Sequence, residues 1–197
     1  MIKSELRKIY LEKQKSLSDA ERNEKSRKIA DGFFGNFNLE NIRFLHLFLS
    51  IEINKEIKTS LIYKRLWQEF PEITTLTSRV NFQTMRLENL KFDSVTKLFK
   101  NKWRIAEPRT GNFVEIEKID AVLVPLLCFD ERGFRVGYGK GFYDKFLSEC
   151  RTDCLKIGLS YFAPAVEITD AADFDVRLDF CITPEKVWEF KRLKVEK

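Results

Sequence analysis

Apolar residues recur at helical spacing in four parts of the chain. Near the N-terminus they fall on one side of a helix that ends close to residue 15. The second helix is predicted to begin at Ser18, because Ser18 and Glu21 together form a capping box, and to stop near Gly35. The four predicted helices cover residues 2–15, 18–35, 57–70 (closed by Pro71) and the stretch from the glycine-rich segment to about residue 150.

Short apolar runs between these helices predict β-strands. The most apolar run, residues 121–129 (AVLVPLLCF), lacks polar alternation and is predicted to be a fully buried central strand. The other predicted strands cover residues 42–50, 73–77, 82–87, 155–161 and 180–183. Helices that alternate with buried strands are typical of a layered α/β domain. We therefore expect three layers, α/β/α, around a mostly parallel or mixed central sheet.

Composition indicates one globular domain over residues 1–197. Hydrophobic residues make up 44% and aromatic residues 13% of the chain, enough for a sizeable core, so a disordered or fibrous protein is excluded. No apolar run is long enough to span a membrane, and residues 1–30 carry too many charges for a signal peptide. We expect a cytoplasmic protein that does not associate with membranes.

Charge and cysteine usage narrow the partners. The chain has 35 Lys and Arg against 30 Asp and Glu, a formal net charge of +5, and opposite charges alternate along it. We expect no nucleic-acid partner, whereas the small positive excess suits an anionic small molecule. The four cysteines form no CxxC pair and the single histidine completes no zinc site. Buried or idle thiols are predicted, and His46, alone in an apolar run, is predicted to pack in the core.

The chain is poor in glycine except in one segment. Eight residues are glycine, and four of them lie between Gly133 and Gly141. There, residues 135–144 (RVGYGKGFYD) follow the most apolar strand and open a helix. Alternate glycines let the backbone approach a ligand, and the N–H groups at a helix start bind anions, with Arg135 and Lys140 adding charge. The spacing GxGxG is not a Walker A motif, but it favours a phosphate-binding loop over a plain glycine turn.

Two aspartates could add a metal ion to this loop. Asp144 falls in the first turn of the predicted helix, where a carboxylate either complements the helix dipole or holds Mg²⁺ beside a bound nucleotide. The local sequence leaves both roles open. Asp175 could supply a second carboxylate, although the local pattern gives it no advantage over Asp170, Asp173 or Asp179.

The glycine-rich segment resembles the signature of the 5-formyltetrahydrofolate cyclo-ligases, also called methenyltetrahydrofolate synthetases. That signature runs roughly VPGxxFDxxGxRLGxGxGYYD, and this chain has VPLLCFD at residues 124–130, then Gly133, Arg135 and GYGKGFYD at residues 137–144. Further similarities follow in chain order over nearly the whole length. They are Lys-x-x-x-Arg at residues 3–7, Glu-Ile-x-Thr at 56–59, Trp-x-Ile-x-Glu-Pro at 103–108 and Asp-Val-x-Leu-Asp at 175–179.

This resemblance implies an ATP-dependent ligase that cyclises 5-formyltetrahydrofolate to 5,10-methenyltetrahydrofolate, with release of ADP and phosphate. In the implied mechanism the γ-phosphoryl group of ATP moves to the formyl oxygen, the neighbouring N10 amine attacks the iminium phosphate, and phosphate leaves. Such chemistry needs alignment and charge neutralisation more than a protein nucleophile. The implied partners are a reduced folate and ATP as substrates, with Mg²⁺ as the cofactor.

Carried over residue by residue, the resemblance assigns ATP to the N-terminal basic pair and the glycine-rich loop. Lys3 and Arg7 lie one turn apart on one helical face, so both could reach the same phosphate chain. The implied ATP-binding residues are Lys3, Arg7, Arg135, Gly137, Tyr138, Gly139, Lys140, Gly141, Phe142, Tyr143 and Asp144. The implied catalytic residues are Arg135, Lys140 and Tyr143, and the implied Mg²⁺ ligands are Asp144 and Asp175.

On the folate side, the resemblance implies that Glu56 hydrogen-bonds the N–H donors of the pterin. Residues 50–56 form a slightly longer segment than in many relatives, so Glu52 is the alternative. Trp103 and Tyr143 would stack on the flat rings of the folate. The implied substrate-binding residues are Ser50, Glu56, Met85, Trp103 and Tyr143, with Phe48 as a weaker candidate.

The chain departs from the family pattern at several positions. Val136 and Phe142 stand where the loop signature has Leu and Tyr, and Leu126 stands in place of its Gly. A frequent His before the late aspartate is Phe174, and a frequent Gln is replaced within residues 163–165. Substrate affinity could therefore differ from that of relatives, but a loss of activity is not implied.

Two other functions stand as alternatives. A phosphate-binding α/β enzyme of the sugar-phosphate isomerase or CoA-transferase type would use the glycine-rich loop without consuming ATP. A non-catalytic nucleotide- or nucleic-acid-binding module would need a basic face with exposed aromatics, which the mixed charges disfavour. We expect a monomer, with a weak dimer as the alternative.

Overall fold

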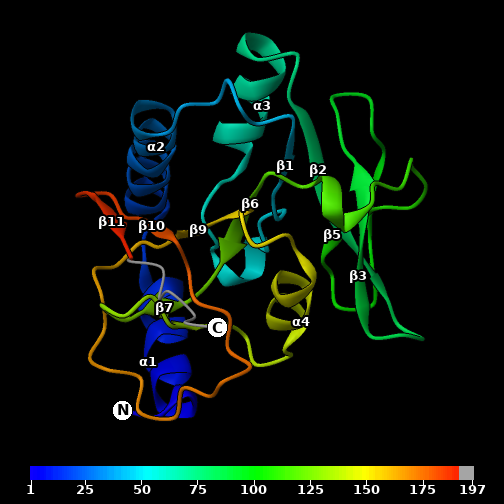
Figure 1. Cartoon of the computed structure of the whole chain (residues 1–197). Coiled ribbons are helices and arrows are strands. Elements are labelled where there is room, and N and C mark those ends of the chain that lie inside the picture. The colour runs from blue at the N-terminus through cyan, green and yellow to red at the C-terminus, as the bar shows by residue number, and fades with distance from the viewer. Residues whose placement is uncertain (191–197) are drawn as a thin grey trace.

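The computed structural model describes residues 1–190, and within them a seven-stranded sheet forms the middle layer (Figure 1). Its strand order is β11-β10-β9-β6-β1-β2-β3. The five inner strands are mutually parallel, while β11 and β3 pair antiparallel at the two edges. The predicted α/β fold with a mostly parallel or mixed central sheet is therefore confirmed.

The elements follow one another along the chain as predicted in kind, though not always in extent. The helices are α1 (Lys3–Ser16), α2 (Asp19–Asn36), α3 (Ser60–Glu69) and α4 (Phe142–Glu149). The strands of the large sheet are β1 (Phe44–His46), β2 (Thr74–Asn81), β3 (Arg86–Lys91), β6 (Ala121–Pro125), β9 (Leu155–Leu159), β10 (Phe180–Ile182) and β11 (Val187–Glu189). Two hairpins stand apart, β4 (Leu98–Lys100) with β5 (Ala106–Pro108) and β7 (Cys128–Phe129) with β8 (Arg135–Val136). Short 3₁₀ turns cover Glu52–Asn54 and Ile116–Lys118.

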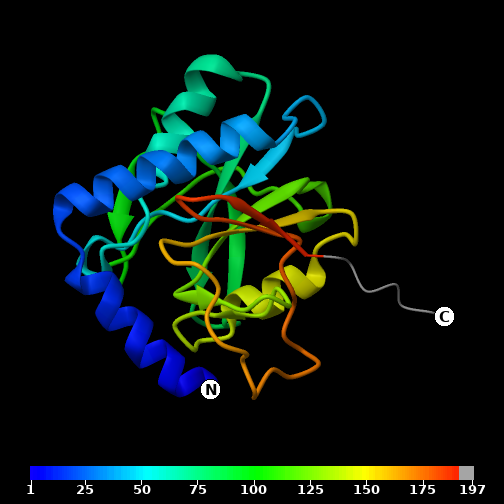
Figure 2. The same cartoon turned by 90° about the vertical axis from the view of Figure 1, so that its left-hand side faces the viewer.

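Helices cover the two faces of the sheet (Figure 2). On one face, Phe33 of α2 and Leu66 of α3 pack with Leu123 of β6 in the largest buried cluster. On the other face, Phe146 of α4 packs with Val122, the neighbour of Leu123. Successive side chains of a strand point to opposite faces, so the fully apolar β6 is buried from both sides. Among the described helices, none is long and apolar enough to cross a membrane.

The N-terminal helix α1 packs outside the large sheet. Its Leu6 lies in a small buried cluster with Cys128 of β7, Val136 of β8 and Ile168. The N-terminal amino group donates to the carbonyl of Glu167 at 2.9 Å, so the start of the chain lies beside the loops around residues 165–175 (Figure 1). These contacts hold α1 against the hairpin that precedes the glycine-rich loop.

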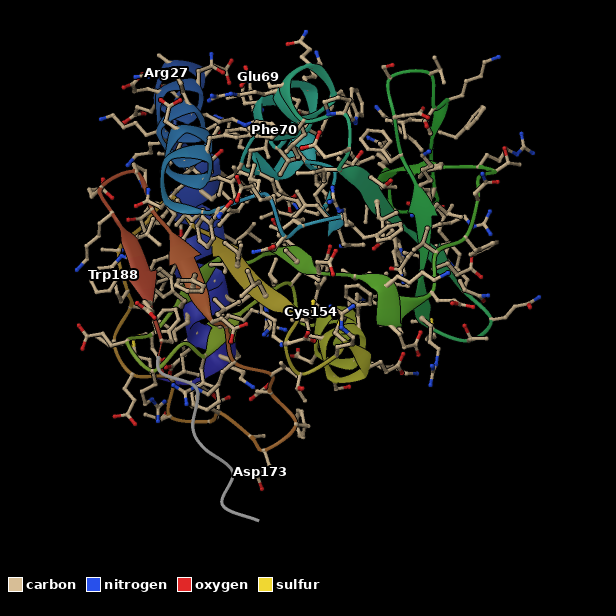
Figure 3. The ribbon with its side chains drawn as sticks, turned by 45° about the horizontal axis from the view of Figure 1, so that its top comes forward. Arg27, Glu69, Phe70, Cys154, Asp173 and Trp188 are labelled. Atoms are coloured by element: carbon tan, nitrogen blue, oxygen red, sulfur yellow. The ribbon has the colours of Figure 1, made fainter. Side chains whose placement is uncertain are left out.

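The predicted capping box is present at the start of α2. Ser18 Oγ accepts from the Glu21 backbone N–H at 3.2 Å, and the Glu21 carboxylate accepts from the Ser18 backbone N–H at 2.8 Å. Both donors would otherwise be unsatisfied at the first turn of the helix. His46 and three of the four cysteines are buried, as predicted, and Figure 3 shows Cys154 beneath the sheet.

The predicted central strand over residues 121–129 is wrong in extent, because it forms two strands in different sheets. β6 ends at Pro125, which has no N–H to continue the ladder. The chain then turns, and β7 pairs with β8 in a hairpin closed through Gly133, whose φ is +85°. The glycine-rich loop therefore follows a separate two-stranded hairpin and not a strand of the large sheet.

Two other strand predictions are corrected at their ends. Residues 42–50 form a strand only at Phe44–His46, because residues 47–55 leave the sheet. The strand predicted over residues 82–87 begins only at Arg86, where β3 starts, because residues 82–85 form the turn that joins β2 to β3. Asn81 Oδ1 accepts from the backbone N–H groups of Gln83 and Thr84, at 3.0 and 3.1 Å, and so closes an Asx turn.

The sheet reverses its strand order at β1. From β1 the chain passes to β2 on one side and returns later to β6 on the other side. In open α/β sheets, ligands bind outside the carboxyl ends of the strands at such a reversal. The topology therefore predicts a ligand site beyond His46 and Pro125, at the carboxyl ends of β1 and β6.

The close packing beside β9 gives a test of this core. A methyl group on Gly158 would lie 2.6 Å from Leu178 Cδ1 and 2.7 Å from Leu126 Cδ2, both on buried side chains. We expect Gly158→Ala to lower the free energy of unfolding by about 1–3 kcal/mol in urea denaturation, because the strand would be overpacked.

The same substitution in α2 is the matched control. Gly35 has no atom within 4 Å of an added methyl group, so Gly35→Ala should leave stability unchanged or raise it, by up to about 1 kcal/mol. Equal unfolding midpoints for the two variants would contradict the packing described beside β9.

Candidate active site

A cavity of about 350 Å³ opens where the topology indicates, outside the carboxyl ends of β1, β2 and β6. Its walls come from segments far apart in the sequence. The lining includes apolar side chains such as Phe48, Leu49 and Val80 together with the glycine-rich loop, residues 137–141. An apolar cavity with a few convergent polar groups is typical of a small-molecule site.

The glycine-rich loop joins β8 to α4. Gly139 and Gly141 have φ values of +85° and +71°, a region that side-chain-bearing residues rarely adopt, and Gly141 is the N-cap of α4. Gly137 takes no positive φ, but nothing lies within 4 Å of where its side chain would begin, so the backbone there is open to a ligand. The loop thus exposes backbone at a helix start, as an anion site requires.

Arg135 lies buried at the base of this loop. One guanidinium nitrogen donates to Asp144 Oδ1 at 2.7 Å, and another donates to the carbonyl of Val176. Burial lowers the pKa of Arg135, whereas the carboxylates of Asp144 and Asp175 raise it. Arg135 therefore joins β8, the first turn of α4 and the late loop through charge-assisted hydrogen bonds.

The basic pair on α1 reaches the same place. Lys3 Nζ pairs with Asp175 Oδ2, and Arg7 Nε donates to the Gly137 carbonyl at 2.9 Å. Asp175 also accepts from the backbone N–H of Ala172 at 2.6 Å. Figure 3 shows Asp173 pointing away from the body of the protein, so of these two aspartates only Asp175 faces the cavity.

Lys140 is exposed at the tip of the loop. Its Nζ lies 6.0 Å from the centre of the Trp103 ring, and no carboxylate of the described residues pairs with it. Trp103 in turn contacts Phe142 with ring centres 5.8 Å apart. Both rings line the cavity, which leaves Lys140 free to meet an anionic ligand there.

Glu56 is a buried carboxyl group in the cavity wall. Its Oε2 accepts from the Ile51 backbone N–H at 2.7 Å, and the Tyr138 hydroxyl lies near enough to favour the ionised carboxylate. Burial raises the pKa of Glu56 to about 7, against the opposing effect of Ile51 and Tyr138. Glu56 is therefore poised to hold or release a proton near neutral pH.

Three other predicted residues do not line the cavity. The Glu52 carboxylate is turned to Arg22, with which it forms two hydrogen bonds of 2.6 and 2.9 Å. Ser50 Oγ donates to the Ile57 carbonyl at 2.5 Å, and Met85 lies exposed at the β2–β3 turn with a φ of +52°. Of the two glutamates that the sequence left open, Glu56 is the one at the cavity.

Every other predicted site residue lines the cavity. They are Lys3, Arg7, Phe48, Glu56, Trp103, Arg135, Gly137, Tyr138, Gly139, Lys140, Gly141, Phe142, Tyr143, Asp144 and Asp175. Ser78 and Glu107 also face the cavity, although neither was among the predicted site residues. Glu107 belongs to the Trp-x-Ile-x-Glu-Pro segment, which was a signal for it, whereas nothing local marks Ser78.

A magnesium site would have to be built partly from ligand atoms. Among residues 1–190 no group of three or more His, Cys, Asp or Glu side chains could hold a metal ion. Asp144 and Asp175 nevertheless both face the cavity and both approach Arg135. Mg²⁺ commonly takes one or two carboxylates together with phosphate oxygens, so this pair fits an ion that arrives with a nucleotide.

Comparison with known proteins points to one family. The model of the 5-formyltetrahydrofolate cyclo-ligase family matches residues 1–184. The 5-formyltetrahydrofolate cyclo-ligase of Escherichia coli K12 is 29% identical over 147 residues, which cover 73% of this chain and 79% of that protein. The protein of the same name from Mycoplasma pneumoniae is 28% identical over 185 residues, covering 94% and 100%.

Solved structures agree with this result. A 5,10-methenyltetrahydrofolate synthetase from Mycoplasma pneumoniae superposes with a TM-score of 0.76 and 26% identity, covering 94% of this chain and 100% of that one. The synthetase of Aquifex aeolicus gives a TM-score of 0.78 and 26% identity, covering 100% and 97%. The resemblance first noted in the glycine-rich segment is thus confirmed over nearly the whole chain.

The pKa of Glu56 predicts how stability depends on pH. Its value rises from an ordinary 4.5 to about 7 on folding, so the folded state favours the protonated form. The stabilisation is complete below pH 4.5 and is lost as the pH rises through 7, a change on the order of 3 kcal/mol. We expect Glu56→Gln to remove this loss. In urea denaturation from pH 5 to pH 8, the free energy of unfolding of the variant should therefore rise relative to that of the wild type.

Glu52→Gln is the matched control four residues away. Arg22 lowers the pKa of Glu52, so this carboxylate stays ionised throughout the same pH range. Its replacement should shift stability by the same amount at every pH. A parallel pH profile for Glu56→Gln and wild type would contradict the raised pKa of Glu56.

Proposed function

The chain belongs to the 5-formyltetrahydrofolate cyclo-ligase family, and we propose that the cavity beside the glycine-rich loop is its active site. The protein is an ATP-dependent ligase of folate metabolism, which cyclises 5-formyltetrahydrofolate to 5,10-methenyltetrahydrofolate. One observation carries the placement of the site: a single cavity joins the cationic loop to Glu56 and a set of aromatic and aliphatic side chains. These two parts of the cavity match the two substrates, because ATP is a polyanion and the folate carries a flat heterocycle.

ATP would bind at the loop end of the cavity. The backbone at residues 137–141 and the start of α4 would receive phosphate oxygens, and Arg7, already hydrogen-bonded to the Gly137 carbonyl, would stand beside them. Lys3 and Arg135 would contribute positive charge from below the loop. In the free protein both are neutralised by Asp175 and Asp144.

The reduced folate would bind at the aromatic end. Glu56 would hydrogen-bond the N–H donors of the pterin, and its depth in the wall would fix how far the ring enters. Trp103 and Tyr143 would lie against the flat rings. Ser50 and Met85, which the resemblance also implied, lie outside this cavity, so we assign them no contact with the substrate.

The reaction would proceed by phosphorylation of the formyl oxygen. Transfer of the γ-phosphoryl group turns that oxygen into a phosphate leaving group and releases ADP. The N10 amine then attacks the carbon, and loss of the N10 proton and departure of phosphate complete the ring. Lys140 would stabilise the negative charge of the transferring phosphoryl group, because none of the described carboxylates pairs with it. Arg135 and Tyr143 would hold the phosphoryl group and the folate in line with one another.

Asp144 and Asp175 would hold Mg²⁺ once a nucleotide is bound. The ion would supply positive charge that neutralises the phosphates. For this, each carboxylate would exchange part of its contact with Arg135 or Lys3 for a metal contact. A phosphate chain close to those two cations would make the exchange favourable, because it would pair with them instead.

Other features of the protein are proposed on more general grounds. We propose a single domain over residues 1–197, a monomer with a weak dimer as the alternative, and a cytoplasmic location. Free thiols such as buried Cys128 and Cys181 suit a reducing compartment.

The decisive assay follows the methenyl product, which absorbs near the ultraviolet edge of the visible spectrum. The purified protein with 5-formyltetrahydrofolate, ATP and Mg²⁺ should produce this absorbance, and omission of ATP should abolish it. Lys140→Ala should lower kcat by about 10²-fold or more, because it removes the cation that meets the transferring phosphoryl group.

Lys102→Ala is the matched control, since Lys102 lies on the same aromatic cluster but does not line the cavity. Its Nζ is 3.9 Å from the centre of the Phe82 ring and 5.7 Å from that of Trp103. Its turnover should stay within about threefold of wild type. An absence of ATP-dependent product from folded wild-type protein would refute the proposed site and activity, and equal losses in the two variants would refute the role of Lys140.

The metal proposal is tested by ATP binding rather than by turnover. With Mg²⁺ present, Asp175→Asn should weaken ATP binding about tenfold in calorimetry, because one ligand carboxylate is lost. Without Mg²⁺, the same variant should bind ATP at least as well as wild type, because a repelling charge is gone. Asp173→Asn, at the exposed aspartate, should change neither value, and a loss that does not depend on Mg²⁺ would contradict the metal role of Asp175.

A further inference from the structure

His46 is a buried polar residue next to the active site that the reaction described above does not use. It is the single histidine of the chain, lies at the carboxyl end of β1 and has no exposed surface. Its ring packs on Phe146, with centres 4.7 Å apart, and lies 6.3 Å from the ring of Tyr143. Burial lowers the pKa of His46 to about 3, so the imidazole is neutral.

The two ring nitrogens of His46 have different surroundings. Nε2 lies 2.8 Å from Ser78 Oγ on the neighbouring strand β2. Nδ1 is buried and has no hydrogen-bond partner among the described residues. A neutral imidazole has one N–H donor and one bare acceptor nitrogen, so one of the two must be left without a partner here.

The cost of that missing partner determines which nitrogen carries the proton. Buried N–H groups without an acceptor are rarer than buried acceptors without a donor. A buried N–H group that lacks an acceptor also loses the free energy of solvation without regaining it in a hydrogen bond. The favoured tautomer therefore places the proton on Nε2, which donates to Ser78 Oγ. The lone pair of Nδ1 is then the unpartnered group, facing apolar neighbours.

This tautomer fixes the direction of the next hydrogen bond. Because Ser78 Oγ accepts from His46, its own O–H is free to donate. The Tyr143 hydroxyl is the neighbouring acceptor, since Ser78 and Tyr143 line the same cavity and Ser78 opposes the rise in the pKa of Tyr143 that burial causes. If Tyr143 accepts from Ser78, its proton turns away from the strand and toward the cavity that both residues line. All donors then run one way, from His46 through Ser78 to Tyr143 and into the active site.

We propose that His46 is a positioning residue, which acts through Ser78 to aim the Tyr143 O–H at an acceptor oxygen of the bound substrate. This inference rests on the proposed function of the cavity. Tyr143 is the group that would touch substrate, while His46 and Ser78 would act through it. A hydroxyl held in one direction needs no reorientation as the reacting oxygen gains charge, which is how preorganised donors lower a barrier.

A purely structural His46 would behave differently from a positioning one. If the ring only fills space beside Phe146, any apolar side chain of similar size should serve as well. The consequences would then appear in stability, and they would be independent of Ser78. A positioning role instead predicts losses that appear in kcat, that are shared with Ser78 and that are relieved by a side chain with a donor near the position of Nε2.

The first test is a set of variants assayed for methenyl product. His46→Phe and Ser78→Ala should each lower kcat about fivefold to tenfold, the size expected for one lost hydrogen bond, with the KM for ATP within twofold of wild type. The double variant should be no worse than either single one, because both break the same chain. His46→Gln, whose amide nitrogen reaches near the Nε2 position, should recover activity to within about twofold of wild type.

Controls separate positioning from packing. His46→Leu repeats the test with a smaller side chain in case the phenyl ring is not accommodated, and Ile29→Val trims a fully buried side chain in the cluster on the opposite face of the sheet. Ile29→Val should lose stability without losing kcat per folded molecule. The proposal would be overturned if the kcat losses of His46→Phe and Ser78→Ala multiplied in the double variant. It would also be overturned if the kcat of His46→Gln were no higher than that of His46→Leu.

The second test does not depend on activity. Because the chain has one histidine, untagged protein labelled with ¹⁵N-histidine gives a single imidazole spectrum. We expect the Nε2 resonance to be that of a protonated nitrogen and Nδ1 that of a bare one. A proton on Nδ1 would overturn the direction of the chain even in an active enzyme. If the wild type were inactive, the proposed function would fail, and this spectrum would still decide the tautomer.

Discussion

The buried guanidinium of Arg135 is the charge on which the whole site depends. Its side chain is 4% exposed, and a cation so far from water is tolerated only when it is paired and fully hydrogen-bonded. Asp144 of α4 and the Val176 carbonyl provide the partners, and Asp175 adds its field. To satisfy one side chain, the chain must therefore bring together the β7–β8 hairpin, the start of α4 and a loop some forty residues later.

That assembly explains why the N-terminal helix belongs to the site. Asp175, which lies near Arg135, also forms an ion pair with Lys3 of α1. One helical turn later, Arg7 donates a hydrogen bond to the Gly137 carbonyl. The apolar side of the same helix packs through Leu6 on the hairpin that carries Arg135. Burial of one face and pairing of the other thus fix α1 in a single orientation, which turns two surface cations into cavity residues.

Features of the fold that depend only on neighbouring residues could be predicted from the sequence. The capping box at Ser18 and the glycine-rich loop follow from residue identity and spacing alone, and both are found as expected. Strand ends were less predictable, because the break at Pro125 separates β6 from β7 and the turn that follows Asn81 replaces the first part of a predicted strand. The apolar character of residues 121–129 hid this break, although Pro125 within the run was a local sign of where the strand ends.

The choice between site residues depended on contacts that only the folded chain makes. The resemblance favoured Glu56 and kept Glu52 as the alternative. In the folded chain Arg22 of α2 holds the Glu52 carboxylate, whereas Glu56 is buried in the cavity wall. Ser78 became visible only through its proximity to His46 in the adjacent strand. Pairings of this kind depend on strand register, which a single sequence does not reveal.

The charges of the site finally explain how a protein with a small net charge can receive a triphosphate. At the loop end, Lys3 with Asp175 and Arg135 with Asp144 form two neutral pairs in the free protein. Arg7 and Lys140 are left without a carboxylate among the described residues, so the loop end of the cavity presents two unpaired cations rather than four. A nucleotide can then redistribute the existing pairs, taking the cations and releasing the carboxylates for a metal ion. Binding in this way exchanges ion pairs instead of creating them, which keeps the desolvation cost of each step low.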